Sequence, residues 1–149
     1  MRDEDWRREA ASYPWGIELD VRFADQDVNQ HLNNVAFVRF LEEGRVRMHH
    51  DLGGKEKLGF RPIVAAVNVN FLAEGGWPGR IEVRSGIVRF GRTSYVVGQA
   101  LFQGGRCICI AEAVMVNRAE DGKGGAPLPE TLTRPLEGLR IAASATGNG

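Results

Sequence analysis

The fold is decided by residues 15–51, which read WGIELDVRFADQDVNQHLNNVAFVRFLEEGRVRMHHD. Apolar residues occupy every second position of residues 17–23, and charged residues lie between them. This period of two predicts a half-buried β-strand. A polar loop at residues 24–32 follows, and Asn33 or a near neighbour then caps a predicted long helix that runs to about residue 51.

The predicted helix differs between its two halves. Apolar side chains fill most positions of the first two turns: Val35, Ala36, Phe37, Val38, Phe40 and Leu41. A helix that is apolar on nearly all sides is expected to be wrapped by other elements. The second half is expected to emerge into solvent, because polar and charged residues dominate it: Glu42, Glu43, Arg45, Arg47, His49 and His50.

Downstream of the helix the pattern predicts strands at residues 62–72, 81–90, 93–103 and 106–117. Glycine-rich turns separate them, and Gly104 with Gly105 forms a predicted two-residue hairpin turn. Residues 1–14 are a predicted polar arm, and residues 141–149 are a predicted disordered tail after at best a short C-terminal helix. The order predicts an α+β fold over residues 1–140, in which a curved five-stranded antiparallel sheet encloses the helix.

Composition excludes several classes of protein. Among the 149 residues, 19 Lys and Arg balance 19 Asp and Glu, which argues against a nucleic-acid or anionic-membrane partner attracted by bulk charge. The chain has no apolar run of membrane-spanning length and no secretory leader, so a cytoplasmic location is expected. Cys107 and Cys109 are interpreted as small buried residues, and no metal site is expected.

The loop at residues 22–34 carries the best candidates for chemistry. It gathers Asp25, Asp27, His31 and several amides directly before a helix start. The unpaired N–H groups and the positive dipole end of a helix can polarise a carbonyl oxygen, and a nearby carboxylate can act as a base or a nucleophile. The same residue types also form turns and caps, so spacing alone leaves both interpretations open.

This loop resembles the signature of hotdog-fold acyl thioesterases, the 4-hydroxybenzoyl-CoA thioesterase-like superfamily. The family pattern is close to R-x-x-D-x-D-x-x-G-H-x-N-N-x-x-Y, with E-x-x-R later on the helix. In this chain the matching positions are Arg22, Asp25, Asp27, Gln30, His31, Asn33, Asn34 and Phe37, then Glu42 and Arg45. The stretch VNQHLNNV is also similar to plastid acyl-carrier-protein thioesterases, and weaker similarity extends to about Leu136. Gln30 in place of Gly and Phe37 in place of Tyr depart from the pattern and are expected to alter the pocket.

The resemblance implies roles for the loop residues. Asp27 matches the catalytic carboxylate, which either attacks the thioester carbonyl or activates water. Asn29 and His31 match residues that lie beside a catalytic Asp in the plastid enzymes, although His31 could equally be a cap or a packed side chain. Asp25 is expected to orient the loop. The backbone N–H groups expected to polarise the carbonyl are those near Asn33, Asn34 and Val35.

Candidates outside the loop are weaker. Arg92, Thr93 and Ser94 resemble the turn with which the family contacts coenzyme A, although an ordinary hairpin turn is as good an interpretation. Asn68 matches a polar position near the active site of the 4-hydroxybenzoyl type, with a structural partner as the equal alternative. Glu42 is a second candidate acid, because related enzymes use a carboxylate in the middle of the helix, but it lies far along the helix.

The resemblance implies an acyl-CoA thioesterase of fatty acid metabolism, which hydrolyses an acyl-CoA thioester to a free acid and CoA. No metal or cofactor is expected, and coenzyme A enters only as part of the substrate. A homodimer or homotetramer is implied, with each active site built from two chains. The alternatives are a thioesterase that acts on acyl-carrier protein, a hotdog dehydratase or hydratase, and a non-catalytic acyl-CoA-binding protein.

Overall fold

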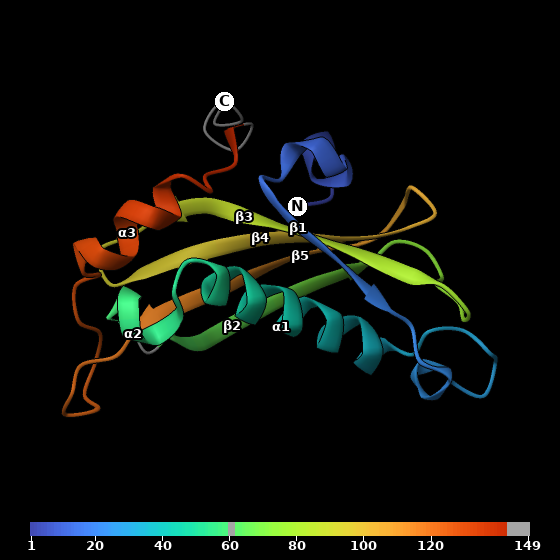
Figure 1. Ribbon diagram of the computed structural model, residues 1–149, viewed down its shortest axis with the longest axis horizontal. Helices are drawn as coiled ribbons and strands as arrows, with labels where there is room; N and C mark the ends of the chain where they lie inside the picture. The colour runs from blue at the N-terminus through green and yellow to red at the C-terminus, as the bar shows by residue number, and fades with distance from the viewer. Residues whose placement is uncertain (60–61, 143–149) are drawn as a thin grey trace.

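The computed structural model describes residues 1–59 and 62–142, and within them five strands form one antiparallel sheet in the order β1-β3-β4-β5-β2 (Figure 1). The strands are β1 (Trp15–Asp20), β2 (Pro62–Phe71), β3 (Arg80–Phe90), β4 (Ser94–Gln103) and β5 (Arg106–Asn117). A long helix, α1 (Asn34–Asp51), lies along one face of the curved sheet. The predicted α+β class and hotdog architecture are confirmed.

Helix α1 is buried on one side only. Asn33 is its N-cap, because the Asn33 side chain accepts a hydrogen bond from the backbone N–H of Ala36 at 2.7 Å. Ala36, Phe37, Phe40 and Leu41 are buried, but Val35 is 77% exposed and Val38 42%. The prediction of a first half wrapped on all sides is therefore wrong for a single chain, because the sheet covers the helix from one direction.

The buried face of α1 continues into its second half, which was predicted to be solvated. Arg45, Met48 and His49 are buried, so the prediction is wrong for this face. They follow Leu41 at helical spacing, so they continue the buried face of the first half. This spacing was the signal in the sequence that could have indicated their burial. Gly44 allows the close approach, since a Cβ atom there would lie 2.5 Å from Val83 Cγ1 on β3.

Strand β2 lies at an edge of the sheet and is poorly covered. Helix α1 packs mainly on β1, β3 and β4, and β2 pairs only with β5 in the described chain. Val64, Val67 and Phe71 of β2 are each about 40% exposed. A seam between α1 and β2 is consequently left partly open, with one hollow near each end of the helix.

The opposite face of the sheet is partly covered by the N-terminal arm. The arm forms two short 3-10 turns, η1 (Asp5–Arg8) and η2 (Ala10–Ser12). The buried Arg7 guanidinium pairs with Glu112 of β5 at 2.6 Å, and the Tyr13 hydroxyl donates to the backbone carbonyl of Arg7 at 2.7 Å. These buried bonds fix the arm to the sheet.

The turns and short helices that connect or follow the strands agree with the sequence-based prediction, except for one additional helix. Gly104 and Gly105 both have positive φ angles and form the predicted two-residue turn between β4 and β5. The C-terminal helix is α3 (Glu130–Glu137). A short helix, α2 (Gly54–Leu58), follows α1 and was not predicted. The predicted tail at 141–149 lies mostly outside the described residues.

A buried polar contact joins α1 to the sheet. The Nδ1 atom of His49 lies 2.6 Å from the backbone oxygen of Arg45, and its Nε2 atom lies 2.6 Å from the Tyr95 hydroxyl. A carbonyl oxygen can only accept, so Nδ1 carries the proton and a neutral Nε2 accepts from Tyr95. Burial lowers the pKa of His49, the bond to the Arg45 carbonyl raises it, and the nearby Arg45 charge lowers it further; the net shift is downward.

This contact predicts a pH-dependent stability. The unfolded chain binds a proton at His49 near the ordinary value of 6.5, whereas the folded chain resists it. The free energy of unfolding should therefore keep its full value above pH 6.5. As the pH decreases below 6.5, it should decrease by up to about 1.4 kcal/mol per pH unit. Denaturant unfolding of His49→Gln should show a shallower fall. His50→Gln, which alters the exposed neighbour, should keep the wild-type slope, and equal slopes in wild type and His49→Gln would contradict the assignment.

Candidate active site

A carboxylate clamp holds the polar loop between β1 and α1. Asp25 is 2% exposed and accepts hydrogen bonds from the backbone N–H and guanidinium of Arg22 and from Nη2 of Arg39 at 2.9 Å. Burial alone would raise the pKa of Asp25, but the bonds from Arg22 and the charge of Arg39 outweigh it and hold the pKa below its ordinary value. The expected orienting role of Asp25 is confirmed by these bonds.

Asp27 lies two residues further and remains exposed. Its Oδ1 atom accepts from the backbone N–H groups of Asn29 at 2.8 Å and His31 at 3.2 Å. Its backbone N–H donates to the carbonyl of His31 at 2.8 Å. Within the described chain Oδ2 accepts no hydrogen bond, so one oxygen is fixed by the loop and the other is available for chemistry.

Gln30 turns the chain inside this loop. Its φ angle is +63°, and in the described residues it is the one non-glycine position with a positive φ. In this conformation the Gln30 N–H donates to the carbonyl of Asp27 at 3.0 Å. Glycine adopts this conformation without steric cost, which explains the glycine of the family pattern at this position.

The helix start provides two free donors. The N–H of Asn33 already donates to the carbonyl of Asp25 at 3.0 Å, and the N–H of Ala36 is used by Asn33. The N–H groups of Asn34 and Val35 have no acceptor among residues 1–59 and 62–142. Of the three residues expected to polarise a carbonyl, Asn33 serves as the cap, and Asn34 and Val35 present the donors.

His31 and Asn29 flank Asp27 through their backbone. The His31 ring is exposed, and its Nε2 atom lies 3.3 Å from the carboxylate of Glu74, in the turn after β2. The ring therefore lies toward Glu74, and within the described chain its nitrogens make no hydrogen bond with Asp27. An exposed ion pair of this kind contributes little stability, so it leaves the His31 ring free to change partner.

Two hollows adjoin the loop. One, of about 410 Å³, is lined by Asp27, Gln30 and the aromatic rings of Phe23 and Trp77, which meet edge to face at 5.1 Å. The other, of about 270 Å³, lies between the start of α1 at Asn34 and the end of β2. Asp27 thus lines one hollow, and Asn34 at the start of α1 lines the other. The aromatic pair was missed from the sequence because Phe23 and Trp77 lie 54 positions apart.

The other candidates lie elsewhere in the chain. The Asn68 side chain shares a face of β2 with Asn70, which accepts from Arg2 of the N-terminal arm at 2.8 Å. Asn68 is therefore turned away from the α1 side. The turn with Arg92, Thr93 and Ser94 is at the far end of β3, an 11-residue strand that spans about 35 Å. Neither candidate joins the loop within one chain.

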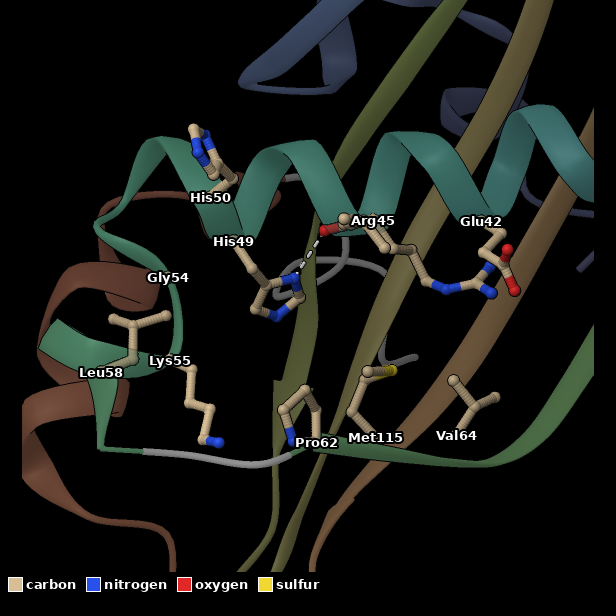
Figure 2. A pocket seen from close by; sticks show the side chains of 11 residues that line it. Glu42, Arg45, His49, His50, Gly54, Lys55, Leu58, Pro62, Val64 and Met115 are labelled. Carbon is tan, nitrogen blue, oxygen red and sulfur yellow. Dashed lines mark hydrogen bonds between the residues drawn. The ribbon is translucent and has the colours of Figure 1, made fainter.

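A third cavity, which we call the α1–β2 cavity, lies at the other end of the seam (Figure 2). Its volume is about 380 Å³. Residues of the second half of α1, of α2, and of β2 and β5 line it, and the apolar ones are Val46, Leu58, Pro62, Val64 and Met115. Sequence reasoning missed this cavity because the second half of α1 was expected to face solvent.

Neither clustered metal ligands nor a membrane-spanning helix is found in the described part of the chain. Within 1–59 and 62–142, no three His, Cys, Asp or Glu side chains gather as metal ligands would. Cys107 and Cys109 are free thiols, and burial raises the pKa of Cys109 to about 12. None of the helices described here has both the length and the apolar composition needed to cross a membrane.

Comparison with known proteins assigns a family to this geometry. The family model described as the thioesterase-like superfamily matches residues 21–136, which include the loop, α1 and all four later strands. No curated protein sequence matches the chain significantly.

Solved structures agree in fold. A predicted thioesterase from Bacillus stearothermophilus has a TM-score of 0.75 at 20% identity, over 85% of this chain and 96% of that one. A thioesterase from Thermus thermophilus, complexed with coenzyme A and zinc, has a TM-score of 0.73 at 27% identity, over 83% and 98%. A 1,4-dihydroxy-2-naphthoyl-CoA thioesterase from Synechocystis has a TM-score of 0.74 at 16% identity, over 82% and 94%.

The strained turn gives a prediction about stability. Replacing Gln30 by glycine should raise the free energy of unfolding by about 1 kcal/mol, because the steric cost of a left-handed residue disappears. Gln26→Gly is the matched control in the same loop, and it should destabilise, since Gln26 has φ of −87°. Denaturant unfolding measures both. A destabilised Gln30→Gly protein would show that the side chain, and not the backbone, sets the turn.

Proposed function

The chain belongs to the thioesterase-like superfamily of thioester hydrolases, and from this premise we propose that it is an acyl-CoA thioesterase with Asp27 as the catalytic carboxylate. The observation that carries the proposal is the geometry of Asp27. Two backbone N–H groups of its own loop fix one oxygen, the other accepts no hydrogen bond from the described residues, and the loop leads into the start of α1. A fixed, exposed carboxylate and free helix N–H groups are the two kinds of group that thioester hydrolysis would use.

The reaction would begin with the thioester carbonyl oxygen at the N–H groups of Asn34 and Val35. These donors and the positive end of the α1 dipole stabilise the negative charge that develops on this oxygen. Asp27 either takes a proton from the attacking water or attacks the carbonyl carbon itself. In both routes the C–S bond breaks, the thiolate leaves and takes up a proton, and water supplies the oxygen of the free acid. Asn29 and His31 hold the Asp27 turn.

Strand β2 supports the proposal that the enzyme is a homodimer. It is an edge strand with exposed apolar side chains, and natural proteins normally pair or cover such an edge. On α1, Val35 and Val46 are also exposed beside the same seam. A second copy that pairs its β2 antiparallel with this one would cover the exposed side chains of both β2 and α1. Two such dimers could also associate into a tetramer.

An antiparallel dimer would also complete the site. Helix α1 and strand β2 run in opposite directions, since Phe37 near the start of α1 stacks edge to face on Phe71 at the end of β2. The two ring centres are 5.3 Å apart. Two-fold pairing therefore sets the loop of one chain beside the far end of its partner. That end carries the turn with Arg92, Thr93 and Ser94, whose side chains suit phosphate and amide groups of coenzyme A. A site shared between chains would unite candidates that one chain keeps about 35 Å apart.

The substrate proposed is an acyl-CoA of the cytoplasm, as in fatty acid metabolism, with no metal or cofactor in the reaction. The solved thioesterase from Thermus thermophilus, which holds coenzyme A, supports this class. A thioesterase acting on acyl-carrier protein is the second candidate, since the Asn29–His31 segment is similar to plastid enzymes of that kind. For Asn68 we propose a structural role. Its side chain accepts a hydrogen bond from Asn70, which in turn accepts one from Arg2 of the N-terminal arm.

Asp27→Asn tests the proposal directly. Release of CoA thiol from short, long and aromatic acyl-CoA esters should fall by about 100- to 10,000-fold in kcat, because the base or nucleophile is lost. Asp121→Asn is the matched control, since Asp121 also accepts a backbone N–H of its own loop, that of Lys123, but lies in the loop after β5. Its activity should equal that of the wild type.

The other outcomes are distinct. Full turnover in Asp27→Asn would assign the chemistry to His31 or Glu42. A wild type without turnover on any CoA ester, but active on acyl-carrier protein, would establish the second candidate. Acyl-CoA that raises the melting temperature without thiol release from either carrier would identify a binding protein.

The dimer has its own test. In Val67→Lys the two lysines would meet near the two-fold axis at the middle of β2, and their repulsion should produce monomers in sedimentation or light scattering. Thiol release should be lost with the dimer. Ala11→Lys adds the same charge on the exposed N-terminal arm and should remain dimeric and active. Active Val67→Lys monomers would show that one chain suffices for the site.

A further inference from the structure

The α1–β2 cavity is lined by a buried cation, Arg45, that has no carboxylate partner among the described residues. Arg45 is 5% exposed, and Nη1 donates to Oε1 of Gln99 at 3.1 Å. Arg45 forms no ion pair with a carboxylate of the described residues. Glu42 is near enough to favour the charge, but it is exposed at the rim and makes no such pair.

The remaining Arg45 nitrogens, Nε and Nη2, are accessible, and the Arg45 side chain lines the cavity. Nε and Nη2 of Arg45 make no hydrogen bond to a described residue. In residues 1–59 and 62–142, the one side-chain nitrogen or oxygen that is both buried from solvent and without a hydrogen-bond partner is Nε of Arg39, so these Arg45 atoms are not fully buried. The Arg45 nitrogens therefore keep accessible surface, and the cavity is the space that the side chain lines. In Figure 2 the Arg45 and His49 side chains lie on the same side of α1 as Met115 and Val64, while His50 lies on the other side.

Much of the rest of the lining is apolar. Val46, Leu58, Val64 and Met115 suit a methylene chain or an aromatic ring. His49 is neutral, because Nδ1 donates to a carbonyl and Nε2 accepts from Tyr95. Among the lining residues that the structure describes, the permanently charged groups are Arg45 and Lys55 against Glu42, which gives one net positive charge.

From this arrangement we propose that the cavity binds the far end of the acyl group and that Arg45 selects an acyl group with a carboxylate at that end. A guanidinium matches a carboxylate in geometry and charge, and the pair is strong where water is excluded. The volume of about 380 Å³ lies within the range typical of small-molecule sites. The inference rests on the proposed acyl-CoA thioesterase, whose dimer would place this cavity of the partner beside the loop with Asp27.

The experiment measures binding without hydrolysis. The probes are S-octyl-CoA and the same thioether with a carboxylate in place of the terminal methyl group, titrated calorimetrically into the full-length protein. The wild type should bind the carboxylated thioether about 10- to 100-fold more tightly, as expected for a buried charge-assisted pair. Equal affinity would overturn the role of Arg45 and leave the thioesterase proposal intact. Failure of both thioethers to bind would overturn the acyl-CoA ligand and both proposals.

Variants localise the preference. Arg45→Met should abolish it while S-octyl-CoA still binds, and Arg45→Lys, which keeps the charge and guards against a folding defect, should retain part of it. Arg47→Met is the matched control, because Arg47 is exposed and pairs with Glu43 outside the cavity. It should keep the full preference. A preference that survives in Arg45→Met would overturn the assignment.

Discussion

A single helix is too narrow to cover a five-stranded sheet, and much of this structure follows from that mismatch. A helix with its side chains is about 10–12 Å across, whereas the outer strands of such a sheet lie about 19 Å apart. Helix α1 approaches β3 closely at Gly44 and packs on β1, β3 and β4. The strand farthest from β1 in the sheet, β2, is left with exposed apolar side chains. The open seam, the expected second copy and the α1–β2 cavity all arise from this uncovered edge.

The same geometry divides the chemistry between the two ends of α1. At its start, the buried Asp25 ties the loop to Arg22 and Arg39, so that Asp27 is presented on a rigid turn. At its other end, Arg45 and His49 are buried against Gln99 and Tyr95. One end presents an acceptor and free N–H donors, and the other a buried cation that has no carboxylate partner in the described part of the chain. A thioester with a charged acyl end needs both groups, and two-fold pairing is what would bring them together.

Most of the fold was predictable, because local patterns determine its elements. Alternation identified the strands, the Asn33 cap marked the start of α1, and Gly104 with Gly105 marked the hairpin. The errors concern burial: Val35 is exposed and Arg45 is buried, in each case opposite to the expectation. Hydrophobicity along the chain does not state how many neighbours a helix has, since that depends on the width of the sheet and on a partner chain.

Residues close together in the chain were enough to predict the strands, α1 and the loop that carries Asp25, Asp27 and the helix cap, and the resemblance of that loop implied the hotdog class. Which atoms are already hydrogen-bonded could be seen only in the folded chain. It showed that the N–H of Asn33 is occupied, that Gln30 bears the left-handed turn, and that Asn68 points away from α1. The contact of Phe23 with Trp77 and the burial of the Arg45 charge could likewise be seen only in the folded chain. In both cases folding brings together residues from distant segments.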